Sequence, residues 1–132
     1  MALHFHRYDQ FSVIKISDDF IKFYYSNLNA NTSENIYPYL RHFTIISSQK
    51  NRHQNDDIVT YFNNLKQMNT QFTDIDYDTL HSGARRINIL VTGTITYDSD
   101  CGRINNKFTE FIHLSTGKEG EAWIQMSMMK II

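Results

Sequence analysis

The chain has 132 residues, with thirteen basic and fourteen acidic side chains and a formal net charge of −1. This balance excludes the strongly basic character of a general nucleic-acid binder. Cys101 is the sole cysteine, which excludes an intramolecular disulfide, and no apolar run is long enough for a membrane span. The first ten residues lack the apolar segment of a secretory signal, so we expect a soluble intracellular protein. One hydrophobic pattern runs throughout, which predicts a single domain over residues 1–132.

The first half of the chain predicts helices. Apolar residues recur at helical spacing from Val13 to Leu28, which indicates one long amphipathic helix over residues 8–28. A short helix over 34–37 should follow, limited by the proline at position 38. Residues 42–47 are β-branched and aromatic and predict a short strand, and the polar residues 48–55 predict a loop. Aspartates at 56 and 57 can begin a further helix that ends near residue 65.

The second half changes from helical to strand periodicity. Strands are expected over about 72–81, 87–97, 107–114 and 122–131, joined by the turn-forming segments 82–83, 98–102 and 116–120. Helices followed by hairpin-connected strands are typical of an α+β fold rather than of alternating β/α units. We therefore expect two to three helices packed on an antiparallel sheet of four to six strands.

Several segments resemble the nuclear transport factor 2-like family when their order and spacing are taken together. Residues 20–28, with the Tyr24-Tyr25 pair, resemble the first helix of the family, and residues 58–65 match its Ile-x-x-x-Phe-x-x-Leu helix. Residues 91–93 match the valine-x-glycine of its long strand. Residues 108–114 resemble its Phe-x-Gln-x-Phe-x-Leu strand, with Glu110 in the place of the glutamine.

The resemblance covers Phe20 to the C-terminus and implies a cone-shaped fold, with helices on a curved sheet, that works by binding partners without a cofactor. The last strand departs from the family by ending in Ser-Met-Met-Lys-Ile instead of an Asn-Asp-x-Phe-Arg-like signature. Within the family, the spacing favours the branch of small mRNA export subunits. Such a subunit would form a heterodimer with a related domain of a large mRNA export receptor. It would help passage past the Phe-Gly repeats of the nuclear pore and shuttle between nucleus and cytoplasm.

Two alternatives remain open. A homodimeric carrier of GDP-bound Ran is suggested by Asp98 and Asp100, which resemble the acidic hairpin of that carrier. An isomerase- or dehydratase-like enzyme would use a pocket inside the cone, with Tyr24 or Tyr25 as a proton donor. Asp74, Asp76 and Asp78 would then be candidate bases, although their alternation predicts a shared solvated face.

The sheet itself predicts where a partner would bind. Short helices can cover one face of a sheet, and a solvated second face should alternate cleanly between apolar and polar residues. The last two strands do not alternate in this way, so we expect their outer face to be buried against another subunit. The alternative is that the long side chains pack under loops. The interface predicted in this way comprises Arg103, Lys107, Phe108, Glu110, Ile112, Leu114, Trp123, Ile124, Met126, Met128 and Lys130.

Histidine and cysteine do not predict a metal or a reactive thiol. The six histidines lack any zinc-like spacing with cysteine, so we expect no metal site. Cys101 stands in a hairpin turn without a neighbouring histidine, which predicts a plain thiol.

Overall fold

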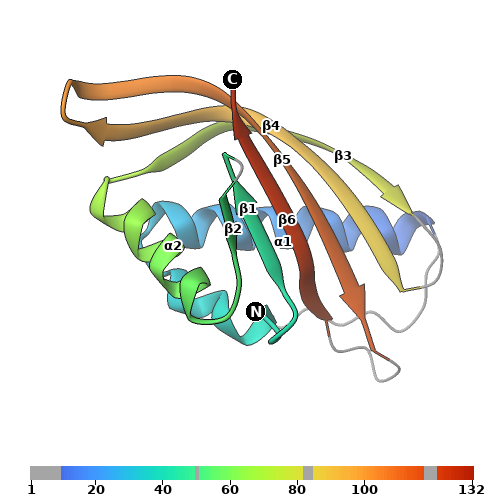
Figure 1. Cartoon of the computed structure of the whole chain (residues 1–132). Coiled ribbons are helices and arrows are strands. Elements are labelled where there is room, and N and C mark those ends of the chain that lie inside the picture. The colour runs from blue at the N-terminus through green and yellow to red at the C-terminus, as the bar shows by residue number, and fades with distance from the viewer. Residues whose placement is uncertain (1–9, 50, 82–84, 118–121) are drawn as a thin grey trace.

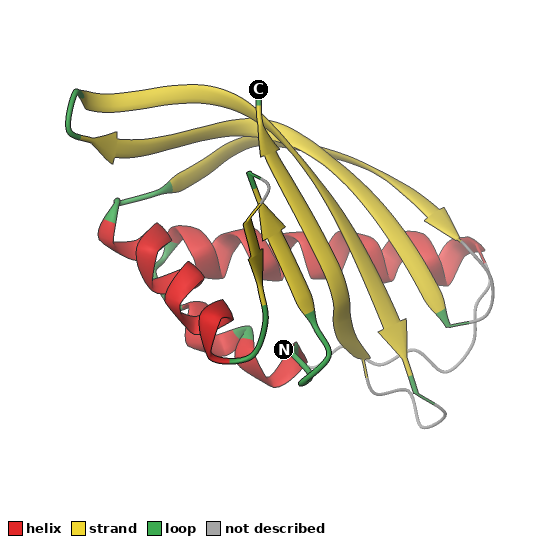
Figure 2. Cartoon of the chain, in the orientation of Figure 1, coloured by secondary structure: helices red, strands yellow, loops and turns green. Residues whose placement is uncertain are grey.

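The computed structural model describes residues 10–49, 51–81, 85–117 and 122–132 (Figure 1). The helical elements are α1 (Gln10–Asn29), the 3-10 turns η1 (Ser33–Asn35) and η2 (Tyr37–Tyr39), and α2 (Asp56–Gln67). The strands are β1 (Ile45–Ser48), β2 (Asn51–His53), β3 (Gln71–His81), β4 (Arg86–Ser99), β5 (Gly102–Thr116) and β6 (Ala122–Ile131). The predicted α+β fold is confirmed, with helices against one curved sheet (Figure 2).

The six strands form one sheet in the order β2-β1-β6-β5-β4-β3. Among the described strands, β1 pairs with β6 in parallel, and each of the other neighbouring pairs is antiparallel. The antiparallel sheet expected from the sequence therefore carries one parallel connection. This parallel pairing places β1, which precedes α2 in the chain, beside the last strand, β6.

Local differences from the sequence prediction have simple causes. The short second helix is instead a pair of 3-10 turns, and Pro38 lies at the start of the second turn, where a missing backbone N–H is harmless. The strand predicted over 42–47 begins three residues later, at Ile45. The segment 48–55, predicted as a loop, contains β2. This edge strand has three polar residues and therefore lacks the hydrophobic alternation by which a strand is predicted. The turn at residues 82–83 and most of that at 116–120 lie outside the described residues.

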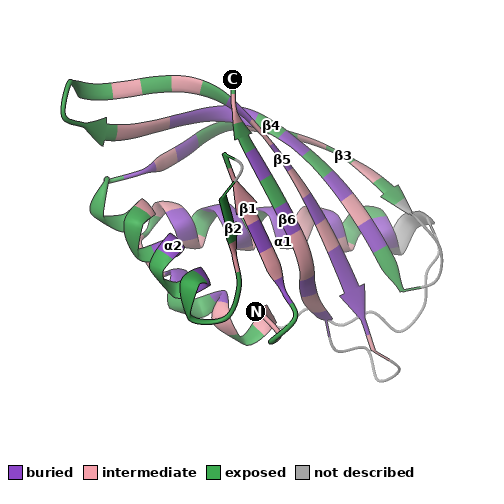
Figure 3. Cartoon of the chain, in the orientation of Figure 1, coloured by how far each residue is buried: buried purple, intermediate pink, exposed green. Residues whose placement is uncertain are grey.

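The core lies between the helices and the concave face of the sheet. Ile87, Ile89, Val91 and Ile95 of β4 are at most 2% exposed, as their alternation predicts. From α1, Phe20 and Tyr24 pack against this face, and Phe62 reaches it from α2. Figure 3 shows the alternation of buried and exposed residues along the strands. None of the described helices is long and apolar enough to cross a membrane.

Two irregularities shape the sheet. The register between β3 and β4 shifts between Thr73 and Asp76, and Asp74 takes a positive φ of 54° in this bulge. Gly93 lies beside it, and a Cβ atom there would be 2.8 Å from Cε1 of Phe108 and 2.9 Å from the carbonyl oxygen of Thr73. Position 93 therefore requires glycine, because a larger residue would collide with Phe108 and with the backbone of Thr73. A second shift, between His113 and Leu114, changes which residues of β6 face the core.

Candidate functional site

The outer face of the sheet carries a row of apolar side chains across its central strands. The registers align Leu90 of β4 with Phe111 of β5, Phe111 with Met128 of β6, and Met128 with Ser47 of β1. Leu90 is 49% exposed and Met128 is 51% exposed. Both α-helices lie on the opposite side of the sheet (Figure 1). Large apolar groups thus stand together on a face that the described helices leave open.

A shallow groove of about 720 Å³ follows this row. We call it the outer-face groove; its lining residues are Ser47, Gln49, Leu90, Thr109, Phe111, Met126, Met128, Met129 and Lys130. Methionine side chains adapt to the shape of whatever they contact, and contiguous exposed apolar surface of this kind marks binding sites. The groove can therefore bind another apolar protein surface.

The predicted interface residues fall into two groups. Met126, Met128 and Lys130 line the outer-face groove, and Lys107 is exposed, with its ammonium group 3.3 Å from the hydroxyl of Thr94. Trp123 is half-buried near the other end of β6, where the guanidinium carbon of Arg41 lies 5.4 Å from its ring centre.

The second group is placed in the core, and this part of the prediction is wrong. Phe108, Glu110, Ile112, Leu114 and Ile124 are all at most 1% exposed. The four residues of β5 alternate regularly and all face the core, so the prediction took the wrong face of this strand. Ile124 was grouped with Met126 and Met128, but the register shift after His113 reverses the alternation of β6 relative to β5.

Leu90, Phe111, Thr109 and Ser47 belong to the outer-face groove but were absent from the predicted interface. One signal could have found Leu90. It is a leucine among the outward positions of β4, whose neighbours Asn88 and Thr92 are polar.

Glu110 lies at the centre of a buried polar cluster inside the cone. Its carboxylate accepts hydrogen bonds from the hydroxyls of Tyr25 at 2.5 Å, Ser127 at 2.6 Å and Tyr24 at 3.4 Å. Burial raises the pKa of Glu110, and the hydrogen bonds from Ser127, Tyr25 and Tyr24 oppose this rise. Burial also raises the pKa of both tyrosines well above the ordinary value, and the charge of Glu110 adds to it.

The cluster contains Tyr24 and Tyr25, the two proton donors that the enzyme alternative would use. The carboxylate beside Tyr24 and Tyr25 is Glu110, and the expected bases Asp74, Asp76 and Asp78 are exposed on the edge strand β3. Glu110 is 1% exposed and is not among the residues that line the outer-face groove. Its oxygens accept from hydroxyls of the same chain, so the arrangement resembles a satisfied core network more than a substrate site.

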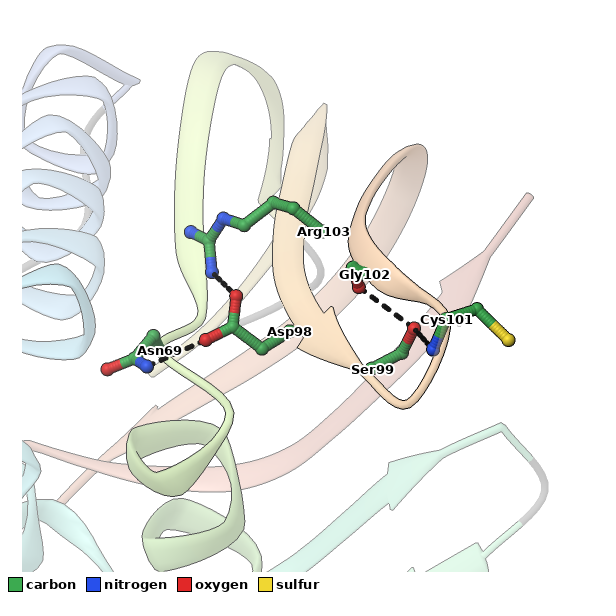
Figure 4. Close-up of polar contacts among 6 residues, drawn as sticks. All are labelled: Asn69, Asp98, Ser99, Cys101, Gly102 and Arg103. Atoms are coloured by element: carbon green, nitrogen blue, oxygen red, sulfur yellow. Dashed lines mark hydrogen bonds and ion pairs between the residues drawn. The ribbon is translucent and has the colours of Figure 1, made fainter.

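The acidic hairpin between β4 and β5 is shown in Figure 4. Asp98 accepts a hydrogen bond from the amide of Asn69 at 2.8 Å and forms an ion pair with Arg103 at 2.7 Å. The hydrogen bond from Asn69 lowers the pKa of Asp98, and that from Arg103 lowers it further. Asp98 and the predicted interface residue Arg103 are thus engaged with each other, whereas Asp100 is exposed at the turn.

Comparison with known proteins shows the family. Residues 16–131 match the "Nuclear transport factor 2 (NTF2) domain", so the chain belongs to this family. No curated protein matches the sequence.

Solved structures show the same fold at low sequence identity. Nuclear transport factor 2 from Cryptosporidium parvum is 21% identical, with 91% of this chain and 94% of that chain covered and a TM-score of 0.69. A ketosteroid isomerase-like protein from Erwinia carotovora atroseptica is 11% identical, with coverages of 83% and 88% and a TM-score of 0.67. A putative calcium/calmodulin-dependent kinase II association domain from Exiguobacterium sibiricum is 9% identical, with coverages of 87% and 89% and a TM-score of 0.68. The fold thus occurs with different functions, and the choice among them depends on the site.

Proposed function

We propose that this chain is a non-enzymatic transport adaptor that binds a partner through the outer face of its sheet. The observation that carries the proposal is the exposed apolar row of Leu90, Phe111 and Met128 in the outer-face groove. The partner is a related domain of a larger mRNA export receptor. The pair would pass the Phe-Gly repeats of the nuclear pore and move between nucleus and cytoplasm.

The chemistry of the groove supports a protein surface as its occupant. Its centre is apolar and lies across four hydrogen-bonded strands, which gives a broad and rigid platform. Lys130 lines the groove and Lys107 is exposed on the same strand pair, so both can meet carboxylates of a partner at the rim. An apolar centre with a charged rim is typical of protein interfaces.

The interior of the cone supports a role without catalysis. The hydroxyls of Tyr24 and Tyr25 both donate to Glu110, so they are already engaged within the chain. A proton donor for a substrate would need one of these hydroxyls at the surface of a pocket. The enzyme alternative would require the Glu110 cluster to open.

A homodimeric carrier of GDP-bound Ran is the second candidate, and the observation in its favour is Asp100, which is exposed at the hairpin tip. Asp98 supports it less, because its carboxylate is held by Asn69 and Arg103. Binding of Ran-GDP by the purified chain, lost on Asp100→Ala, is the result that would favour this candidate.

The main proposal is tested with the tagged chain expressed in its own cell. We expect a large export receptor subunit to co-purify with it, and a Leu90→Ser, Met128→Ser double variant to lose that subunit. Ile14→Ser is the matched control, because Ile14 is 53% exposed but lies on α1. These exposed positions should change the free energy of unfolding by only about 0.5 kcal/mol each. Recovery of the same subunit by the double variant, or of no such subunit by the wild type, would contradict the proposal.

A further inference from the structure

A second cavity lies on the helix-covered side of the sheet and shares Gln49 and Met129 with the lining of the outer-face groove. It has a volume of about 360 Å³ and is bordered by β2, the second half of α2, and residues near the ends of β4 and β6. We call it the α2–β2 cavity. Its volume falls in the range of about 300–1,000 Å³ that is usual for small-molecule sites.

The floor and one wall of this cavity are apolar and aromatic. Ile95 and Met129 are 2% and 5% exposed and contribute to its floor, and Leu65 adds to it from α2. Tyr61 is 7% exposed, and the ring of His53 packs against it at 5.0 Å between centres and an angle of 32°, so the two rings together form one wall. A planar group can stack against such a wall.

The rim of the cavity is polar but uncharged. Its polar side chains are Ser48, Gln49, Asn51, His53, Asn64 and Thr70. Among the described residues that line the cavity, none is Asp, Glu, Lys or Arg. A charged ligand would therefore lose hydration without gaining an opposite charge, whereas a neutral one with donors and acceptors would find partners.

One of these polar groups is unsatisfied. The hydroxyl of Thr70 is buried without a hydrogen-bond partner, and the residue is 2% exposed. Buried polar atoms without partners are rare and often mark a place where another group binds. A ligand polar atom at this end of the cavity would complete the hydrogen bonding of Thr70 after a rotation of its side chain.

We propose that the α2–β2 cavity binds a small, neutral, planar molecule with hydrogen-bonding groups along its edge, of the nucleobase kind. The ring stacks against the wall that His53 and Tyr61 form, and its edge meets the amides of Asn51 and Asn64 and the hydroxyl of Thr70. Side-chain amides can form paired hydrogen bonds with the edge of a base. A purely apolar ring fits less well, because it would bury these polar groups without partners.

The test is an NMR titration of the labelled full chain with adenosine and with uridine. We expect at least one nucleoside to shift the backbone amide signals of residues 51, 64 and 70, with a Kd on the order of 1 mM or below. Asn64→Ala and Thr70→Val should each weaken binding by about three- to tenfold. Asn63→Ala is the control, because Asn63 is an exposed neighbour on α2 that does not line the cavity. Thermal unfolding of each variant verifies that it is folded.

Four results would overturn this inference. The first is the absence of shifts with both nucleosides up to their solubility limits. The second is tighter binding of adenosine 5′-monophosphate than of adenosine, which would show that charge governs the site. The third is equal binding of N-acetylphenylalanine amide, which would show that an apolar ring suffices. Equal effects of Asn64→Ala and Asn63→Ala would likewise contradict the assigned location.

Discussion

The hydroxyl of Tyr25 in α1 donates a hydrogen bond of 2.5 Å to the carboxylate of Glu110 in β5, although 85 residues separate them along the chain. The contact fastens the long helix to the centre of the sheet. It also places an ionisable group in the core, where burial raises its pKa. The pKa shift of Glu110 should consequently contribute to the pH dependence of the stability.

The first prediction concerns Glu110→Gln. Because the pKa of Glu110 is higher in the folded state than its ordinary value of 4.5, the group stabilises the fold fully at a pH below that value. This contribution is lost as the pH rises through the raised pKa. The tyrosines facing it from α1 and α2 have raised pKa values and stay neutral in this window. Glu110→Gln should flatten the fall in the free energy of unfolding above pH 4.5, measured by urea denaturation at several pH values.

The control for this prediction is Glu34→Gln, which neutralises an exposed carboxylate of η1. It should leave the pH profile close to that of the wild type. A Glu110→Gln profile that still falls like the wild-type one would show that another group controls the pH dependence.

The second prediction compares the two tyrosines. Tyr25→Phe removes the donor at 2.5 Å from one carboxylate oxygen, whereas Tyr24→Phe removes a donor at 3.4 Å from the other oxygen, to which Ser127 also donates. Tyr25→Phe should lower the free energy of unfolding by about 1–3 kcal/mol, and Tyr24→Phe by less. Urea denaturation at neutral pH measures both; a larger loss for Tyr24→Phe would contradict this ranking.

The third prediction concerns Gly93→Ala. The new Cβ atom would lie 2.8 Å from the buried ring of Phe108 and 2.9 Å from the backbone oxygen of Thr73. Because a core ring and a backbone atom cannot both move freely, we expect a loss of about 1–3 kcal/mol in the free energy of unfolding. Thermal and urea denaturation measure it. An unchanged midpoint would mean that the β3 bulge relaxes without strain.

The fourth prediction concerns Gly102→Ala, where glycine is needed for its backbone conformation and not for close packing. A Cβ atom there meets nothing within 4 Å, but the backbone has φ of +108°. The expected loss is about 1 kcal/mol and comes from the backbone conformation alone. It should change local hydrogen exchange at the hairpin turn more than the packing of the core.

The fifth prediction concerns the hairpin between β4 and β5. Asp98→Ala removes the acceptor for Asn69 and Arg103. The amide of Asp98, which donates to the carbonyl of Met68 at 2.8 Å, should then exchange its hydrogen faster. Asp100→Ala should not have this effect, because the bonds to Asn69 and Arg103 are made by Asp98. Amide exchange followed by NMR separates the two outcomes; equal rates in both variants would contradict a structural role for Asp98.

Much of the fold could be predicted from the sequence because its periodic segments are long. The apolar stripe of α1 and the alternation of Ile87, Ile89 and Val91 in β4 each repeat several times. Each pattern can therefore be recognised even where a single residue departs from it. β2 could not be found in this way, since its three residues are polar and paired at an edge. The parallel pairing of β1 with β6 is a long-range event with no local signature.

The candidate site was predicted less well for a related reason. The sequence indicates that β5 and β6 carry more apolar residues than one face needs, but it does not show which face of β5 points outward, and a register shift reverses the alternation within β6. Met126 and Met128 were assigned to the outer face, whereas Ile124, two residues before Met126, proved to be in the core. The role of Glu110 was also missed, because a carboxylate in a strand normally indicates a solvated position.

The parallel pairing of β1 with β6 has a consequence for folding. β3, β4 and β5 are joined by hairpins and can associate through nearby contacts, but Ile45 meets Met126 only after some eighty residues of chain have been ordered. Pairing across such a separation is intrinsically slow. β6 is the strand on which these two parts of the sheet meet. We therefore expect an early three-stranded meander with a late-docking β1–β2 hairpin, so the wall of the α2–β2 cavity that β2 provides would be completed last.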